Sequence, residues 1–191
     1  MKMLILAVLS MLLASCGIQS IPQAKNDVEA KLAQTTNQYK RRADLVPGLV
    51  NIVKGYAAHE KEALESVTKL RTQATQVTID VSKLDPAQIK KFQKVQSELS
   101  QSLGRLLAIS ENYPDLKANQ NFRDLQVQLE GTENRIAVAR KNYIQSIQHF
   151  NNLVTVFPTS LTNQYFFGFE KMPQWDVADS ENVEQAPEIK F

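Results

Sequence analysis

The chain has 191 residues, 43% hydrophobic and 22% charged, which suits one folded domain and excludes a disordered chain. Its formal net charge of +2 gives no overall field that would attract nucleic acid. The single cysteine excludes an internal disulfide and an all-thiolate metal site. Only 6 glycines and 7 prolines interrupt a sequence rich in Ala, Leu, Gln, Glu and Lys, so we expect an all-α protein.

The N-terminus has the features of a bacterial lipoprotein signal. Lys2 precedes an apolar stretch over residues 3–13, which at about 1.5 Å per residue is too short to span a bilayer. The following "LASC", residues 13–16, resembles a lipobox, in which small residues precede a cysteine that receives lipid. That resemblance implies cleavage after residue 15, a diacylglyceryl group on Cys16 and usually acylation of the new amino terminus. A buried structural cysteine is the alternative.

These features predict where the protein lies. We expect residues 1–15 to be a signal peptide and residues 16–23 to be a short tether behind the lipid on Cys16. Gly17 stands where an aspartate retains lipoproteins at the inner membrane of some bacteria. The protein is therefore expected on the outer surface of a cell with one membrane, or on the periplasmic leaflet of the outer membrane in a cell with two.

Apolar residues recur at helical spacing from about residue 24 to residue 158. The first predicted helix runs from near Asp27 to near Ala43. A second starts at Asp44, which can cap it, and continues to about residue 77. One continuous helix that is kinked at Pro47 is the alternative.

Two further helices follow. Asp85 and Pro86 are typical of a helix start, so the third helix runs from there to about Asn112. The last is expected to cover about 38 residues, roughly 57 Å, and to end before Pro158. Four helices with short connections predict an antiparallel up-down four-helix bundle over residues 24–158. An extended coiled coil or a self-associated bundle is the alternative.

Two stretches are similar to the signatures of one family. "QYKRRADLVPGLVNIVKGYAAHEKEALESVTKLR", residues 38–71, resembles the first signature of the LemA family. Residues 111–158, beginning "ENYPDLKANQNFRDLQVQLEG", resemble the second, and the whole resemblance covers about residues 24–170. It implies an antiparallel helical bundle attached to a bacterial membrane by its N-terminus and facing outward, without an established activity. Family members usually carry an N-terminal transmembrane helix, in whose place this chain has the lipobox.

No motif points to catalysis. His59 and His149 lie on different predicted helices without the Glu-x-x-His spacing of di-iron bundles. A metal site that joins both histidines to Glu60 or Glu62 is the alternative to ordinary helix-surface histidines. The sequence contains no Gly-x-Ser-x-Gly elbow, Walker loop or dinucleotide-binding glycine pattern. We expect no enzyme, no cofactor and no metal.

A basic run at Lys40, Arg41 and Arg42 is a candidate partner-docking patch; its alternative role is to stabilise the end of the first helix. It would lie about 30 Å from the membrane-proximal end, several times the Debye length of about 8 Å, which argues against lipid headgroups as its partner. Interhelix ion pairs that fix register are a further expectation, among Arg42, Asp44, Glu133 and Arg135.

Residues 159–191 form a tail beyond the last helix, first aromatic and then acidic. Its aromatic residues are Tyr165, Phe166, Phe167, Phe169 and Trp175. They either fold back over an open end of the bundle or form an exposed patch for a partner. The acidic remainder is expected to be disordered.

Together these features predict a membrane-anchored scaffold or adaptor that binds an envelope protein and does not bind nucleic acid. The alternative is a structural or membrane-organising protein that works by self-association.

Overall fold

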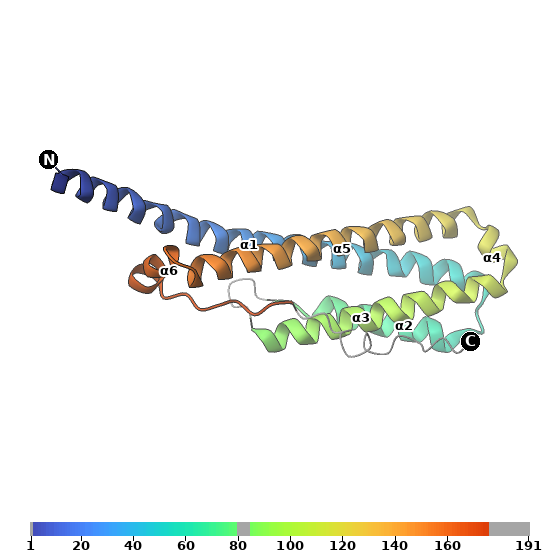
Figure 1. Ribbon diagram of the computed structural model, residues 1–191. Helices are drawn as coiled ribbons and strands as arrows, with labels where there is room; N and C mark the ends of the chain where they lie inside the picture. Colours follow the sequence, from blue (N-terminus) through green and yellow to red (C-terminus); the bar gives the residue numbers. More distant parts are fainter. Residues whose placement is uncertain (1, 80–84, 176–191) are drawn as a thin grey trace, which may run out of the picture.

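The computed structural model describes residues 2–79 and 85–175, with side chains from residue 18 onward (Figure 1). Within those residues it contains six α-helices and no strand. They are α1 (Lys2–Tyr56), α2 (Lys61–Gln76), α3 (Pro86–Ile109), α4 (Pro114–Ala118), α5 (Gln120–Thr155) and α6 (Thr159–Thr162). The all-α class is confirmed. The four-helix up-down bundle is not, because six α-helices of very unequal length are present.

The long helices α1 and α5 lie side by side and run in opposite directions (Figure 1). α2 and α3 form a helical hairpin that packs beside them, and α2 contacts α1. The short α4 connects α3 to α5 at one end of the molecule. At the other end α6, followed by a π-helical turn at Asn163–Phe167, packs against α1.

α1 continues through Ala43 and Asp44, so the predicted boundary between two helices is wrong and the single-helix alternative is right. Pro47 lies inside the helix and lacks the N–H that would bond to the carbonyl of Ala43. The Nε of Arg71 in α2 donates to that carbonyl over 3.4 Å. A tertiary contact thus supplies the donor that proline removes.

The two ends of α1 also differ from expectation. Residues 16–23, predicted as a tether, are helical, and Ile21 is fully buried in the core. The side chain of Cys16 is outside the described residues. The helix ends at Tyr56, and residues 57–60 turn the chain where the sequence pattern predicted uninterrupted helix.

The other predicted helix ends are confirmed to within a few residues. Asp85 caps α3 by accepting a hydrogen bond from the N–H of Ala87 at 2.9 Å, and Pro86 is the first helical residue. The side chain of Asn119 caps α5 in the same way, accepting from the N–H of Phe122 at 3.0 Å. α5 covers 36 residues and ends before Pro158.

Buried side chains form two apolar clusters along the molecule. The first joins α1, α3, α5 and the tail, and includes Ile21, Val28, Leu32, Tyr39, Phe92, Ile136, Tyr143, Ile147, Phe150 and Trp175. The second joins α1 to the other end of the hairpin and to α4, and includes Val46, Leu49, Val53, Val67, Leu99, Leu103, Leu106, Leu116, Phe122 and Leu129. On α1 the clusters meet between Tyr39 and Val46.

Two searches of the described residues bear on function. Among them, no helix carries an apolar stretch of the length that a bilayer crossing requires. Nor do His, Cys, Asp and Glu side chains gather there in groups of three or more suited to a metal ion.

Candidate functional site

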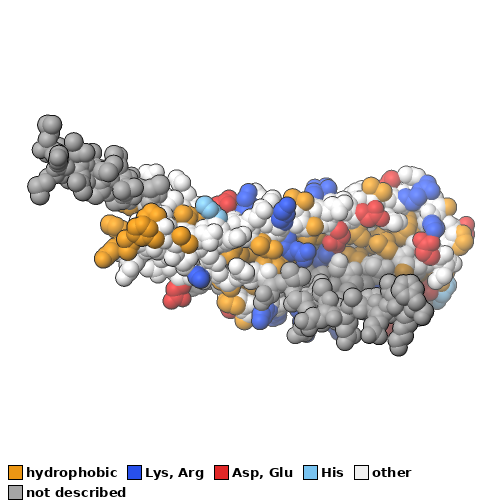
Figure 2. Space-filling view, in the orientation of Figure 1, with side chains coloured by type: hydrophobic (Ala, Val, Ile, Leu, Met, Phe, Trp, Pro, Cys, Tyr) orange, Lys and Arg blue, Asp and Glu red, His pale blue; other side chains and the backbone are white. Residues whose placement is uncertain are grey.

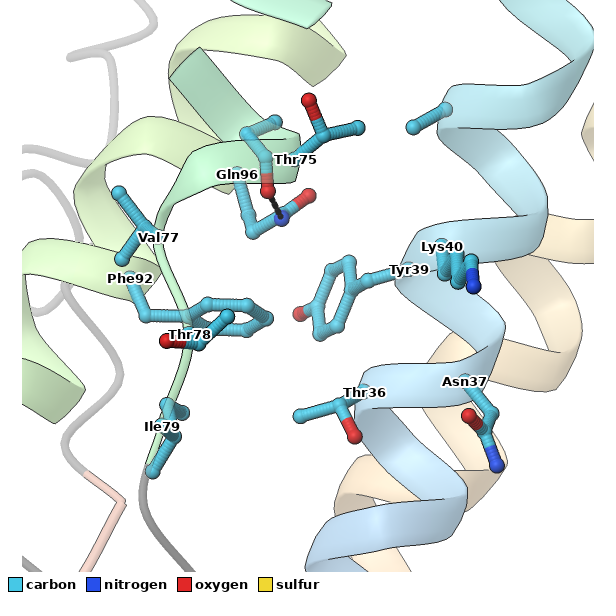
Figure 3. A pocket seen from close by; sticks show the side chains of 12 residues that line it. Thr36, Asn37, Tyr39, Lys40, Thr75, Val77, Thr78, Ile79, Phe92 and Gln96 are labelled. Carbon is cyan, nitrogen blue, oxygen red and sulfur yellow. Dashed lines mark hydrogen bonds between the residues drawn. The ribbon is translucent and has the colours of Figure 1, made fainter. Parts of the chain in front are cut away.

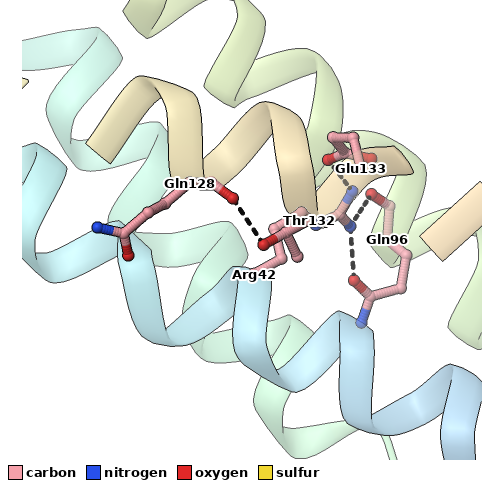
Figure 4. Close-up of polar contacts among 5 residues, drawn as sticks. All are labelled: Arg42, Gln96, Gln128, Thr132 and Glu133. Carbon is pink, nitrogen blue, oxygen red and sulfur yellow. Dashed lines mark hydrogen bonds and ion pairs between the residues drawn. The ribbon is translucent and has the colours of Figure 1, made fainter. Parts of the chain in front are cut away.

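Arg42, predicted as part of a docking patch, is buried between the two apolar clusters, with 2% of its surface exposed. Figure 4 shows its polar contacts. Its Nη1 donates to Glu133 Oε1 in α5 at 2.8 Å. Its Nη2 donates to the backbone carbonyl of Gln96 in α3 at 2.8 Å and to its side-chain Oε1 at 2.7 Å. The guanidinium also lies 5.1 Å from the centre of the Tyr39 ring. Arg42 therefore cannot dock a partner, because its donors are turned inward.

The same network reaches a fourth helix. Gln96 Nε2 lies 3.5 Å from the carbonyl of Ala74 in α2 and donates to it. The predicted interhelix ion pair is confirmed for Arg42 and Glu133. Arg135 instead donates to the hydroxyl of Thr132 on its own helix at 2.8 Å. The Nε of Arg42 has no hydrogen-bond partner among the described residues.

The other two cations of the run, Lys40 and Arg41, are exposed. Lys40 stands at the rim of a cleft of about 320 Å³ between α1, the C-terminal end of α2 and α3 (Figure 3). Tyr39 and Phe92 meet edge to face in this cleft, with ring centres 5.1 Å apart. Burial raises the pKa of the Tyr39 hydroxyl, while Arg140 and Arg42 oppose that rise. The sequence analysis singled out Lys40 but missed the cleft beside it.

The lining of the cleft combines apolar and neutral polar groups with one cation. Its residues are Thr36, Asn37, Tyr39, Lys40, Ala43, Ala74, Thr75, Val77, Thr78, Ile79, Phe92 and Gln96. The side chains of Val77 and Ile79 come from the extended segment after α2, whereas most of the other lining residues come from α1 and α3, which are distant in the sequence. Such a lining suits an apolar side chain accompanied by a carboxylate, which Lys40 can bind.

The aromatic tail divides into buried and exposed residues. Trp175 is buried and meets Tyr143 and Phe92 edge to face, at centre distances of 5.4 and 6.4 Å. Phe167 and Phe169 are half-buried and stack on each other at 5.5 Å. Tyr165 and Phe166, in contrast, are exposed. Trp175, Phe167 and Phe169 thus fold back onto the domain, whereas Tyr165 and Phe166 are exposed. Binding of a partner by the exposed aromatics stays a prediction.

Two asparagines hold the tail in place. Asn151 in α5 donates to the carbonyl of Met172 at 2.9 Å and accepts from its N–H at 2.8 Å. Asn163 bonds to the backbone of Phe169 in the same two-way manner, at 2.9 and 3.0 Å. The sequence analysis did not identify either residue. An asparagine whose side-chain amide pairs with the backbone of a residue further along the chain is not marked by any pattern in the neighbouring sequence.

The hydroxyl of Tyr143 is buried beside Trp175 and has no hydrogen-bond partner among the described residues. Its burial raises the pKa of Tyr143 to about 12. The group is therefore a neutral, unpaired hydroxyl within the first apolar cluster.

The two histidines do not meet. His59 lies in the turn after α1, where its Nε2 is 2.7 Å from the hydroxyl of Tyr113, and that hydroxyl donates to Glu60 Oε1 at 3.1 Å. His149 is exposed near the opposite end of α5. His59 therefore serves to join the α1–α2 turn to the segment before α4.

Comparison with known proteins identifies the family. A family model described as the LemA family matches residues 31–191. The chain belongs to the LemA family. Protein LemA of Metamycoplasma hominis is 28% identical to it over 151 residues, which are 79% of this chain. The chain spans 60% of the length of that LemA relative.

Removing the charge that faces Arg42 tests the network in this LemA-family chain. Glu133→Gln is expected to lower the free energy of unfolding by about 1–3 kcal/mol, because it leaves a buried guanidinium without its counter-charge. Urea denaturation followed by circular dichroism measures the change. Glu130→Gln, on the exposed side of the same helix, is the control and should change stability by less than about 0.5 kcal/mol. Equal effects of the two variants would contradict a structural role for the pair.

Tyr143 predicts a stability loss at high pH. An unfolded tyrosine titrates near pH 10, so above that pH the unfolded chain releases a proton that the folded chain keeps until about pH 12. The contribution is fully present below pH 10 and falls by about 1.4 kcal/mol per pH unit above it. Tyr143→Phe should remove this slope and, by deleting an unpaired hydroxyl, add about 1 kcal/mol at pH 7. The free energy of unfolding is measured by denaturation at pH values from 8 to 11, with the exposed Tyr165→Phe as control. The prediction is refuted if both variants lose stability with rising pH to the same extent as the parent protein.

Proposed function

We propose that this chain is a non-catalytic lipoprotein of the bacterial envelope, held at the membrane surface by lipid on Cys16. In a cell with two membranes it faces the periplasm from the outer membrane. Its helical domain acts as a scaffold or adaptor that binds another envelope protein. The lipobox supports the anchor, and the cleft beside Lys40 supports the binding role.

The position of the cleft on α1 favours a protein over lipid as its occupant. Cys16 and Lys40 are both in α1, which is continuous between them. At about 1.5 Å per residue the cleft lies roughly 36 Å along the helix from the anchor. That is several times the Debye length of about 8 Å, so the charge of Lys40 is screened from lipid headgroups.

The chemistry of the cleft supports binding rather than catalysis. Its lining holds no histidine, cysteine or carboxylate among the described residues, and these side chains most often serve as acids, bases and nucleophiles. The partner segment that suits it carries an apolar or aromatic side chain for the space between Tyr39, Phe92 and Val77. A nearby carboxylate of that segment would pair with Lys40.

Self-association is a second candidate, favoured by one face of α5. Val127 and Val138 are 66% and 59% exposed there, and their spacing of eleven residues places them on the same side of the helix. A shallow groove beside Val138 is lined by Gln38 of α1, whose buried Oε1 has no hydrogen-bond partner among the described residues. A second copy could cover the two valines and supply a donor to that oxygen.

The anchor is tested by Cys16→Ser. The variant is expected to lose the lipid mass at the mature terminus and to leave the membrane fraction, since the acyl chains supply most of the binding. Mass spectrometry and membrane fractionation measure both. A variant that stays tightly bound without lipid would contradict the anchor.

The adaptor role is tested by crosslinking in living cells. A photoreactive amino acid in place of Thr75, in the cleft, should give one recurrent heterologous adduct, whereas the same amino acid in place of Thr72, outside it, should not. Lys40→Glu should remove most of the adduct by reversing the charge at the rim, and Lys54→Glu, elsewhere on α1, should leave it unchanged. Adducts between two copies alone would shift the conclusion to self-association.

A further inference from the structure

A group of apolar side chains is exposed where α5 ends and the chain turns back. We define this end patch as Val156, Phe157, Leu161, Tyr165 and Phe166, which are between 47% and 77% exposed. They come from the turn after α5, from α6 and from the π-helical turn Asn163–Phe167. Figure 2 shows apolar side chains gathered at this end of the molecule, beside α1. Single exposed apolar residues are common on protein surfaces, whereas a contiguous group of them indicates an interaction site.

The patch lies at the level where α1 enters the folded domain. α6 and the π-helical turn both contact α1. Lys25 Nζ lies 6.0 Å from the centre of the Phe169 ring, just after that turn, and Ile21 is buried in the adjoining cluster. Ile18, 43% exposed, is two residues after Cys16, or about 3 Å along the helix axis.

Charge is absent from both segments that meet at this end. Residues 3–24 and residues 142–169 contain no Asp, Glu, Lys or Arg, although 42 of the 191 residues in the chain are of these types. The nearest charged side chains on α1 begin at Lys25, which pairs with Glu29 at 2.7 Å. Exposed Phe and Tyr side chains in a segment without charged residues are typical of the boundary between lipid headgroups and hydrocarbon.

We propose that the end patch inserts into the interfacial layer of the membrane that holds Cys16, so that the lipid surface is its partner. The inference rests on the anchor of the proposed function, which brings this end of α1 to the bilayer. A protein partner is disfavoured because it would have to fit between the domain and a membrane that is only a few residues of helix away. The five residues of the patch carry no charge, so we expect their insertion not to depend on anionic lipid.

The lipid on Cys16 and the end patch together would fix the orientation of the domain on the membrane. A lipid on Cys16 alone leaves the domain free to tilt about its attachment point. The end patch, on α6 and the π-helical turn, adds a second contact displaced from the axis of α1, and together they restrict that tilt. The cleft beside Lys40 is then presented at a constant height above the membrane.

A single label tests the insertion. Lipid consumes the thiol of Cys16, the one cysteine of the chain, so Gln164→Cys introduces one free thiol next to Tyr165 without removing a patch residue. The full-length lipoprotein, labelled there with a fluorophore, is reconstituted into phosphatidylcholine vesicles that carry a nitroxide at headgroup depth. Gln128→Cys, at another exposed position, in α5 outside the patch, is the matched control. We expect quenching at residue 164 several-fold above that at residue 128, and the same ratio when anionic lipid is added.

Substitution of the patch gives the second readout. The triple change Phe157→Ser, Tyr165→Ser and Phe166→Ser should reduce quenching at residue 164 to the level of residue 128. Val127→Ser with Val138→Ser, which also removes exposed apolar surface, should leave quenching unchanged. Circular dichroism establishes that both variants fold, and the comparison of residues 164 and 128 in the otherwise native chain does not depend on them.

Each other outcome is decisive. Equal quenching at residues 164 and 128 would overturn the insertion. So would a disulfide between two copies through residue 164, which would make a second copy the occupant of the patch. Mass spectrometry of Cys16 reports the anchor separately. If Cys16 carries no lipid, the anchor fails, and the quenching measured on a Cys16→Ser, Gln164→Cys chain with the same vesicles still decides whether the patch inserts.

Discussion

A buried guanidinium between two apolar clusters is the interaction on which the arrangement of the helices depends. A guanidinium carries a positive charge, so the burial of Arg42 is tolerated only where Glu133 and both oxygens of Gln96 face it. Because those partners are on α5 and α3, and Gln96 in turn bonds to α2, the hydrogen bonds define one relative position of four helices. Apolar packing alone would allow the helices to slide past one another, since leucine and valine side chains pack in several registers.

The long continuous α1 connects the parts of the proposed function. Its N-terminal part carries Cys16, its first buried turns support the tail and the end patch, and its middle carries Lys40 at the cleft. A chain broken at Ala43 would have separated these features with a hinge. Instead, the contact of Arg71 with the Ala43 carbonyl compensates for Pro47, so the hairpin of α2 and α3 helps to keep α1 in one piece.

Residues 159–175 of the tail are part of the domain rather than an appendage, while the acidic remainder, predicted to be disordered, lies outside the described residues. Trp175 completes the first apolar cluster by packing on Tyr143 and Phe92, and the two asparagine clamps hold the backbone that leads to it. This folding back leaves Tyr165 and Phe166 at the turn with no place in the core. The exposed aromatics are thus a consequence of how the tail returns, and the same path brings them next to α1.

The sequence by itself determined the all-α class, the family, the cap at Asp85 and the end of α5 before Pro158, because periodicity, capping and proline act within a few residues. It also named Arg42 and Glu133 among four residues expected to form interhelix ion pairs. Only the tertiary structure decided that α1 runs through Pro47, that Arg42 is buried while Lys40 lines a cleft, and which tail aromatics are covered. Each of these depends on a contact between residues far apart in the chain, such as Arg71 with Ala43 or Trp175 with Phe92. Local sequence patterns do not predict such contacts.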